Sequence, residues 1–377
     1  MSLRYTGAWL QDGAFNPLTA PTPSYTYGIW SFGLNSSGEL GQGNTTNLSS
    51  PKQVGSLTNW ASVSANVGSS MGIKTDGTLW AWGANNTGQL GLGNRTYYSS
   101  PKQVGALTTW STVSAGQYCG IAIKTDGTLW SWGYNAQGQL GLGNQTYYSS
   151  PKQVGSLTTW SSVSIKGYSV AAIKTDGTLW SWGYNAQGQL GLGNTTYYSS
   201  PKQVGSLTNW KSVSAGYYFT IATKSDGSLW TWGYNGTGCL GLGNSTAYSS
   251  PKQVGSLTNW LQVTAGQTRS CALSIKTDGT LWSWGQNTEG ELGQGNTSYF
   301  SSPKQVGALT GWAFVNAGGQ QVLATKTNGT LWAWGKNNNG QLGLGNTTSY
   351  SSPVQVGSLT TWSSAATGYN HNIVLQY

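Results

Sequence analysis

The feature that most constrains this chain is a phrase that returns about every 50 residues. The 16 residues LWSWGYNAQGQLGLGN occur letter for letter at 129–144 and again at 179–194. A W-x-[WF]-G motif and an S-P-[KV]-Q-V-G motif each occur seven times, 50 residues apart except for one step of 52. The prolines of the second motif are Pro51, Pro101, Pro151, Pro201, Pro251, Pro303 and Pro353. Self-similarity at this period is typical of propellers and solenoids.

One repeat, residues 111–160, reads as a four-stranded antiparallel sheet. STVSA, GIAIK and TLWSW are short β-favouring runs, and the TDG between the last two is a strong hairpin signal. SPKQV reads as a fourth strand, and its proline suits a sheet edge, where a missing N–H costs little. No segment carries helical periodicity, and the density of glycine would penalise a helix. Such a sheet leaves both faces in need of cover, which radial stacking of copies provides.

The two ends of the chain decide between a closed ring and an open stack. The first repeat starts late, at YGIWSFG from Tyr27, and lacks the stretch that precedes this motif elsewhere. The last repeat stops early, and the SSAATGYNHNIVLQY that follows Trp362 matches the missing stretch. An open solenoid would need polar caps, whereas a ring has no exposed terminal edge. We therefore predict an all-β fold, a seven-bladed β-propeller of four-stranded antiparallel blades over residues 25–377, with the first blade closed by both termini.

Composition excludes several classes of protein. Disorder is not expected, because 21 Trp and 21 Tyr give each repeat ample surface to bury. No apolar run approaches the length of a membrane span, and the N-terminus lacks the basic and apolar regions of a signal peptide. We therefore expect no membrane insertion, and the cellular location stays open. Cys119, Cys239 and Cys271 occupy different places in their repeats, so we interpret them as incidental thiols rather than a disulfide framework.

The net charge of +9 does not indicate a specific nucleic-acid partner. Six lysines lie in the proline motif, from Lys52 to Lys304, and six more in the KTDG-type turns, from Lys74 to Lys326. Five of the second set are partly offset by an aspartate two residues later. Proteins that read nucleic acids usually gather Lys and Arg on one face, whereas this charge is spread around a ring. We interpret it as a source of solubility and weak, non-specific attraction.

The run AGQYCGIAIKTDGTLWSWGYNAQGQLGLGN resembles the repeat of the regulator of chromosome condensation family, whose pattern includes A-G, a hairpin and W-G-x-N-x-x-G-Q-L-G-x-G. The resemblance covers about residues 25–377 and implies a seven-bladed propeller with repeats split across the closure. The family usually has a histidine shortly after A-G, which only His371 approximates here. The resemblance also suggests nucleotide exchange on a small GTPase, which members perform with a projecting wedge. The largest irregularity here is two extra residues near 267–276, so exchange activity ranks last.

The chain offers little for catalysis. A Ser–His–Asp or Cys–His site would depend on the single histidine, His371, for which a structural hydrogen bond is the better interpretation. Histidine, cysteine and carboxylate residues are not clustered at metal-ligand spacing, and GQLGLGN is followed by extended chain rather than the helix of a phosphate loop. We therefore expect no enzymatic activity, no metal and no cofactor.

Two segments differ most between the repeats. One follows the VSA strand, and the other follows W-G and begins at Leu34, Ala84, Tyr134, Tyr184, Tyr234, Gln286 and Lys336. Tracing the antiparallel strands places both at the same end of each blade, opposite the nearly unchanged TDG turns and GSLTTW links. The predicted binding residues on this rim are Tyr118, Tyr134, Tyr168, Tyr184, Tyr217, Tyr218, Tyr234, Arg269, Gln286, Lys336 and Tyr369, with Gln320 adding polar variety. Neutral drift of exposed loops explains the variation equally well. The repetitive TYY segments, such as Tyr147–Tyr148, suggest packing of the outer blade.

Residues 1–24 stand outside the repeats and form an extended arm, which either docks to an assembly or straps the ring. The favoured hypothesis is a non-enzymatic recognition or assembly module whose variable rim binds a protein or a cell-surface glycan. Near-identical Trp-rich repeats with an arm look similar to virion-attached propellers of bacterial viruses, which suggests a phage tail or host-recognition component. The rival is a purely structural virion decoration protein that docks to other virion proteins through residues 1–24.

Overall fold

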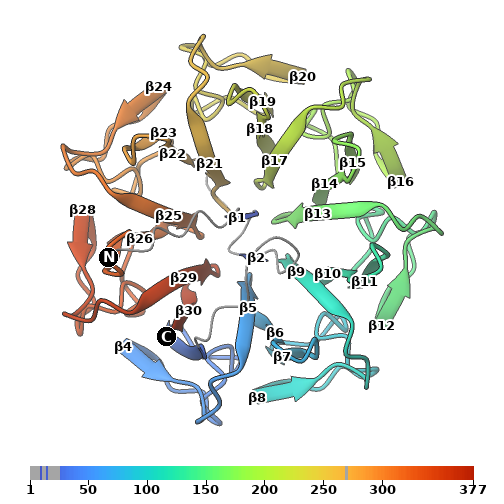
Figure 1. Ribbon diagram of the computed structural model, residues 1–377, viewed down its shortest axis with the longest axis vertical. Coiled ribbons are helices and arrows are strands. Elements are labelled where there is room, and N and C mark those ends of the chain that lie inside the picture. Colours follow the sequence, from blue (N-terminus) through green and yellow to red (C-terminus); the bar gives the residue numbers. More distant parts are fainter. Residues whose placement is uncertain (1–8, 11–13, 16–25, 268–270) are drawn as a thin grey trace, which may run out of the picture.

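The computed structural model, which describes residues 9–10, 14–15, 26–267 and 271–377, is a ring of seven four-stranded sheets around a central axis (Figure 1). The described residues contain no helix, and hence none long and apolar enough to cross a membrane. Blade 1 consists of β29, β30, β3 and β4, and blades 2 to 7 follow in chain order from β5–β8 to β25–β28.

Each blade has the same four strands, in order from the axis outward (Figure 1). The inner strands are β5 (Trp60–Ala65), β9 (Trp110–Gly116), β13 (Trp160–Ile165), β17 (Trp210–Ala215), β21 (Trp260–Ala265), β25 (Trp312–Ala317) and β29 (Trp362–Thr367). The second strands are β6 (Ser69–Lys74), β10 (Cys119–Lys124), β14 (Ser169–Lys174), β18 (Phe219–Lys224), β22 (Cys271–Lys276), β26 (Gln321–Lys326) and β30 (His371–Gln376).

The third strands carry the W-x-[WF]-G motif and are β7 (Leu79–Gly83), β11 (Leu129–Gly133), β15 (Leu179–Gly183), β19 (Leu229–Gly233), β23 (Leu281–Gly285), β27 (Leu331–Gly335) and β3 (Gly28–Gly33). The outer strands carry the proline motif and are β8 (Tyr98–Gln103), β12 (Tyr148–Gln153), β16 (Tyr198–Gln203), β20 (Tyr248–Gln253), β24 (Phe300–Gln305), β28 (Tyr350–Gln355) and β4 (Leu48–Gln53). The proline therefore lies in an edge strand, as predicted.

Both termini build blade 1, which confirms the predicted closure. Strand β3 pairs antiparallel with β30 from Gly28 opposite Gln376 to Gly33 opposite His371. The C-terminal stretch therefore supplies the two inner strands that the first repeat lacks. Of the N-terminal arm, the structure describes only β1 (Trp9–Leu10) and β2 (Ala14–Phe15), which pair with each other near the centre of the ring (Figure 1). Strand β2 lies beside β5 and β9.

The TDG turn joins the second and third strands through a short chain of hydrogen bonds. In blade 3, Gly127 has a φ of 77°, and a Cβ added there would lie 2.2 Å from the carbonyl oxygen of Thr158, so only glycine fits. The Thr128 hydroxyl donates to Asp126 Oδ1 over 2.6 Å and accepts the Trp130 indole N–H over 2.9 Å. The repeated threonine thus links the turn to the half-buried first tryptophan of the third strand.

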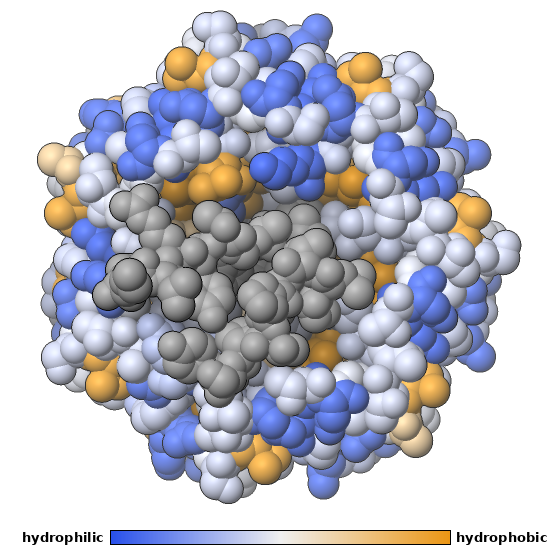
Figure 2. Space-filling model, viewed as in Figure 1, coloured by the Kyte–Doolittle hydropathy of each residue, from blue (hydrophilic) through white to orange (hydrophobic). Residues whose placement is uncertain are grey.

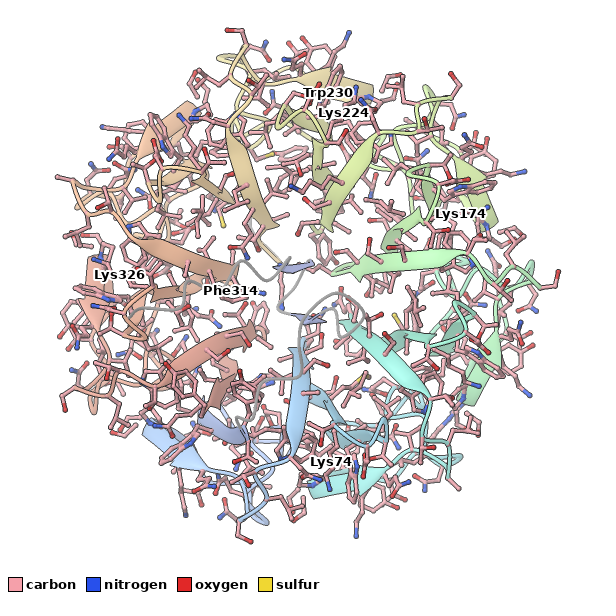
Figure 3. All side chains as sticks on the ribbon, in the orientation of Figure 1. Lys74, Lys174, Lys224, Trp230, Phe314 and Lys326 are labelled. Carbon is pink, nitrogen blue, oxygen red and sulfur yellow. The ribbon has the colours of Figure 1, made fainter. Side chains whose placement is uncertain are left out.

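The turn lysines pack against tryptophan rather than extending into solvent, which the sequence did not indicate. Lys124 Nζ lies 3.7 Å from the centre of the Trp130 ring and 5.1 Å from that of Trp110. Lys74, Lys174, Lys224 and Lys326 occupy the same place in their own blades (Figure 3). Burial lowers the pKa of each of these lysines, and cation–π attraction to the rings offsets part of that cost.

The hydrophobic core is divided among the blade interfaces. The cluster between blades 3 and 4, for example, combines Ile121 and Leu129 of one blade with Val163 and Trp182 of the next. Each sheet therefore depends on its neighbours for the burial of its apolar side chains, as expected for stacked repeats.

In each of blades 2 to 7, the second tryptophan of the third strand forms a hydrogen bond to the preceding blade, a contact that we call the tryptophan clip. The Trp182 indole N–H in blade 4 donates over 3.0 Å to the carbonyl oxygen of Gln139 in blade 3. A Cβ added to Gly141 would lie 2.7 Å from the same indole nitrogen, so this glycine makes room for the ring. The same bond recurs at five further interfaces, from Trp82 to Glu39, Trp132 to Gln89, Trp232 to Gln189, Trp284 to Cys239 and Trp334 to Glu291.

The closing interface between blades 7 and 1 makes this bond with a different residue. Phe32 occupies the place of the tryptophan, and its side chain has no N–H to donate. The Asn372 side chain on the neighbouring strand donates to the Gln341 carbonyl oxygen instead, over 2.5 Å. Asn372 lies opposite Phe32 as Val170 lies opposite Trp182. The acceptor is thus satisfied here by a compensating pair.

A serine belt joins the inner strands around the axis. The Ser64 hydroxyl oxygen accepts the Ala115 N–H of the next blade over 2.9 Å, and Ser114 accepts the Ile165 N–H over 3.2 Å. Ser164, Ser214 and Thr264 do the same for Ala215, Ala265 and Ala317. The serine of the repeated VSA motif therefore links neighbouring blades as well as forming a strand.

Glu39 places a carboxyl group in a buried position where four of the other blades have glutamine, one has Cys239 and one has a second glutamate, Glu291. Its Oε2 accepts the Ser37 N–H over 2.7 Å, as Gln139 Oε1 accepts the Gln137 N–H over 3.0 Å. Burial raises the pKa of Glu39 to about 7 from its ordinary 4.5. Since the folded pKa lies above the unfolded one, the contribution to stability is complete below pH 4.5 and is lost as the pH rises through 7.

We predict that Trp182→Phe destabilises the protein because it leaves the Gln139 carbonyl oxygen buried without its indole donor. The expected cost is about 1–3 kcal/mol in urea unfolding. Adding Val170→Asn to this variant copies the Phe32–Asn372 pair and should recover part of the loss, whereas Val170→Asn alone should not stabilise the wild type. Equal stability of the single and double variants would contradict the compensation.

We also predict that Glu39→Gln leaves stability unchanged near pH 4 and raises it at pH 8. The expected gain is on the order of 2–3 kcal/mol, because the variant no longer has to bury an ionised carboxylate. Chemical unfolding at both pH values measures it. Gln139→Glu is the matched control and should introduce the same loss of stability with rising pH. A gain that is equal at both pH values would rule out titration as the cause.

Candidate functional site

Both variable loops lie at one end of each blade, as the strand tracing predicted. In blade 3 the Tyr134 N–H, in the loop after W-G, donates over 2.9 Å to the Tyr118 carbonyl oxygen, in the loop after the inner strand. Tyr184 and Tyr168 make the same bond in blade 4, and Tyr234 and Tyr218 make it in blade 5. We call this end the variable rim. The TDG turns and the GSLTTW links are bonded at the other end, the uniform rim, as in Thr125 N–H to the Thr109 carbonyl oxygen.

The variable rim carries a continuous cluster of nine tyrosines over blades 3, 4 and 5, which we call the tyrosine patch. Ring contacts run from Tyr118 to Tyr134 at 6.4 Å between centroids, from Tyr134 to Tyr168 at 5.5 Å and from Tyr168 to Tyr217 at 6.0 Å. The patch consists of Tyr118, Tyr134, Tyr147, Tyr168, Tyr184, Tyr197, Tyr217, Tyr218 and Tyr234. Seven of these were predicted, and the structure brings them together on adjacent blades.

Tyr147 and Tyr197 correct the interpretation of the TYY segments. They were assigned to packing of the outer blade, but Tyr147 lies 4.7 Å from Tyr134 and Tyr197 lies 4.9 Å from Tyr184. The second tyrosine of each pair does pack as expected, since Tyr148 contacts the core between blades 3 and 4. Tyr147 follows Tyr134 by 13 residues, and the two rings meet because the loop between them folds back. The sequence alone does not show that the loop folds in this way.

The tyrosine patch contains no carboxylate, and one cation, Arg95 of blade 2, lies close enough to Tyr147 to lower its pKa against the larger, raising effect of burial. Burial, with smaller effects from neighbouring tyrosines, raises the pKa of Tyr217 to about 12 and also raises the pKa of Tyr168. The hydroxyl groups of Tyr168 and Tyr217 therefore stay protonated at physiological pH and can both donate and accept hydrogen bonds. Residues 110–253, which span the three blades, contain only three carboxylates, Asp126, Asp176 and Asp226, and these lie in turns of the uniform rim.

Tyr118 is held in an unusual backbone conformation within the patch. Its φ is 63°, the left-handed region, which no other non-glycine residue among the described ones adopts. Gly68 occupies the same place in blade 2 with a φ of 64°. The Tyr118 carbonyl oxygen accepts both the Tyr134 N–H and the Thr87 hydroxyl, so its loop is fixed from two sides.

Gln286, Lys336 and Tyr369, which were also predicted as binding residues, do not join the patch. Arg269 lies outside the described residues. Gln286 is only 7% exposed, and its side chain donates to the Thr288 hydroxyl. Lys336 donates to Gln320 Oε1 over 3.0 Å in blade 7, and Tyr369 lies in blade 1 beside Gly319. These residues belong to blades 6, 7 and 1.

Part of the loop variation serves the interior rather than the rim. Asn66, Lys166 and Gln267 belong to the variable segment after VSA, but all three are buried and bond to carbonyl oxygens near the axis. The sequence grouped them with exposed loop residues because neighbours in one segment can point to opposite sides. This variation is structural.

The remaining reactive groups are buried. His371 Nε2 lies 3.0 Å from the Ser70 hydroxyl, the structural contact expected of it, and burial lowers its pKa to about 3. The three cysteines are free, as predicted, and the structure shows that all three are buried, which raises the pKa of the Cys119 and Cys271 thiols. Over the part of the chain that the structure describes, no group of three His, Cys, Asp or Glu residues could hold a metal ion.

The uniform rim repeats the same features at each blade. One half-exposed leucine lies in every link, at Leu57, Leu107, Leu157, Leu207, Leu257, Leu309 and Leu359. Hydrophobic patches recur around the periphery of the face seen in Figure 2, separated by hydrophilic ones. A groove of about 330 Å³ between blades 3 and 4 is lined by Leu157, Trp180 and Pro201. Its lining residues recur at the other interfaces, so this rim does not distinguish one blade from another.

Comparison with known proteins identifies the repeats. The sequence model of the regulator of chromosome condensation (RCC1) repeat matches residues 28–73, 76–123, 126–173, 176–223, 226–273, 278–325 and 328–375. A segment of 51 residues is 47% identical to Protein RCC2 of Mus musculus and 43% identical to Protein RCC2 of Homo sapiens. That segment is 13% of this chain and 10% of each relative, so the match spans about a tenth of the length of these curated relatives.

Solved structures share the whole architecture. Prp20p from Saccharomyces cerevisiae aligns with a TM-score of 0.84 at 18% identity, over 94% of this chain and 92% of that one. Human WBSCR16 aligns with a TM-score of 0.82 at 22% identity, over 93% of this chain and all of that one, 100%. Likeness at such identities shows a common fold. With seven matched repeats that cover nearly every residue of the ring, the chain belongs to the regulator of chromosome condensation (RCC1) repeat family.

Proposed function

We propose that this protein is a non-enzymatic recognition module whose tyrosine patch binds a protein or glycan partner. The observation that carries the proposal is the joining of nine tyrosines from three neighbouring blades into one cluster on the rim where the repeats differ. Binding surfaces are commonly built from loops on a rigid scaffold, and a propeller provides one.

The chemistry of the patch suits a macromolecular surface. Tyrosine gives a large contact area, loses little conformational entropy on binding and keeps a hydroxyl group for hydrogen bonds. The side chains are already held by ring contacts, such as Tyr217 to Tyr218 at 4.4 Å, so little ordering remains to be done on binding. The tyrosine side chains bring hydroxyl groups and ring faces rather than charges to this surface, which favours a partner that is not recognised mainly through ion pairs.

Relatives of the same fold support a binding role. Prp20p of Saccharomyces cerevisiae is described with its binding properties to Gsp1p and histones, and a complex of Kap60 with the same protein is known. The partner surfaces of those proteins are not transferred to this chain, because 17–18% identity does not carry individual residues. What transfers is the use of an RCC1-repeat ring as a protein-binding scaffold.

Two rivals remain distinct from this proposal. One is a purely structural decoration protein, in a virion of a bacterial virus, that docks through residues 1–24. The other is an enzyme or a guanine nucleotide exchange factor. Exchange factors of the family use a projecting wedge, and the only extra length in this ring falls at residues 267–276, of which 268–270 lie outside the described residues.

We predict that changing Tyr134, Tyr184 and Tyr234 together to alanine weakens binding of the partner at least about tenfold, since each hot-spot tyrosine contributes roughly 1–2 kcal/mol or more. Screening on glycan and protein arrays with the wild-type protein identifies the partner, and titration of the variant measures the loss. Tyr134→Ala and Tyr184→Ala should change the melting temperature little, because these two rings are not part of the cores between blades. Tyr234→Ala should lower it slightly, because the Tyr234 ring packs against the core between blades 5 and 6.

Tyr97 and Tyr299 provide the matched control. Both are exposed tyrosines outside the patch, so alanine at these positions should leave binding intact. If the patch variant binds every array ligand as tightly as the wild type does, the patch is not the binding surface.

The structural rival makes the opposite prediction. Deletion of residues 1–24 should then release the protein from its assembly, while the tyrosine changes leave the assembly intact. Under our proposal the deletion variant retains array binding. Co-sedimentation of both variants with the purified particle distinguishes the two. Nucleotide exchange or turnover by the purified protein would favour the third alternative.

A further inference from the structure

The ends of the inner strands bring backbone carbonyl oxygens together near the axis. Five of these oxygens accept hydrogen bonds from side chains of other blades, those of Ala65, Ala115, Ala265, Ala317 and Thr367. They come from blades 2, 3, 6, 7 and 1. Carbonyl oxygens that converge on one region form a local concentration of negative partial charge, which requires donors or a cation.

Three side chains supply the donors, and they reach across the ring. Asn66 Nδ2 donates to the carbonyl oxygens of Ala115, over 2.7 Å, and Lys166, over 3.0 Å. Gln267 Nε2 donates to the carbonyl oxygens of Ala65 and Thr367. Except for the bond from Asn66 to Ala115, which joins the neighbouring blades 2 and 3, these bonds connect blades that are not neighbours, unlike the tryptophan clips and the serine belt. We call the three side chains and their acceptors the axial hub.

Lys166 is the charged member of the axial hub. It is 4% exposed, and its Nζ donates to the Ala265 carbonyl oxygen over 2.6 Å, the Ala317 carbonyl oxygen over 3.2 Å and the Thr264 hydroxyl over 3.3 Å. These three acceptors are neutral oxygens, of which two are backbone carbonyls. Transfer of an ammonium group out of water is costly unless other dipoles replace its hydration shell, which these oxygens can do.

Comparison of the repeats shows that a lysine stands at this position in one blade only. The equivalent residues are Gly116, Gly216, Gly266, Gly318 and Gly368, with Asn66 as the other exception. A cavity of about 10 Å³ remains beside Lys166, lined also by Ala65, Ala115 and Asn316, which is room for about one water.

We propose that the carbonyl oxygens of the axial hub form a binding site for a monovalent cation, and that the Lys166 ammonium is its resident cation. The tethered ammonium joins blade 4 to blades 6 and 7 across the axis. This role requires both the hydrogen bonds and the positive charge, and it predicts that a free cation of similar size can take the place of the side chain.

Lys166→Gly tests the site, because glycine is the residue found at the equivalent position of five other blades. When both proteins are measured in choline chloride, we expect the variant to have a lower melting temperature than the wild type. Potassium or ammonium chloride at equal ionic strength should restore at least half of the loss. The wild type should show no such preference, since its site is filled. Equal melting temperatures of the variant in all three salts would overturn the proposal.

Lys166→Gln separates the effect of the charge from that of the hydrogen bonds. It also tests the cation site if the Lys166→Gly variant does not fold. Glutamine keeps N–H donors but has no charge, so we expect a melting temperature below that of the wild type and no recovery with potassium. Wild-type stability of Lys166→Gln would show that neutral donors suffice and would overturn the cation site. Lys211→Met is the control, since it removes an exposed lysine from β17 and should change nothing.

Discussion

The ring depends on the indole N–H that each of blades 2 to 7 donates to a carbonyl oxygen of the blade before it. It fixes two things at once, because the same tryptophan needs a glycine beneath it and a tight loop that presents the oxygen. In blades 3 and 4 these parts are Trp182, Gly141 and Gln139. Each copy of the repeated phrase therefore carries both parts of this contact: a tryptophan that donates to the blade before it, and a carbonyl oxygen that accepts from the blade after it.

This division of labour explains where the repeats agree and where they differ. Contacts that join blades, namely the tryptophan clip, the serine belt and the lysine between two tryptophans, recur with little change. Loops of the variable rim take no part in these contacts beyond their backbone hydrogen bonds, so their side chains are free to differ. The tyrosine patch is confined to blades 3, 4 and 5, where this freedom has produced one continuous aromatic surface. Stability and recognition thus depend on separate residues of the same repeat.

The sequence predicted the architecture because the evidence for it is repeated. Seven copies of a strand pattern and two complementary ends define the ring, and the pairing of Phe32 with Asn372 follows from that match. Contacts between blades were not predictable, since they join residues 43 or 51 positions apart whose side-chain directions depend on the twist of each sheet. Tyr147 was assigned to packing, and Lys166 to the rim, for the same reason. Repetition shows that a residue recurs but does not show which way it points.

Footprinting of the complex tests the central claim that the variable rim of blades 3 to 5 is the recognition surface. Hydroxyl-radical labelling with and without the partner measures which tyrosines the partner covers. The account predicts protection of Tyr134, Tyr147 and Tyr218, with labelling of Tyr299 and the link leucines of the uniform rim unchanged. Protection confined to the uniform rim or to residues 1–24, with the patch still fully labelled, would contradict it.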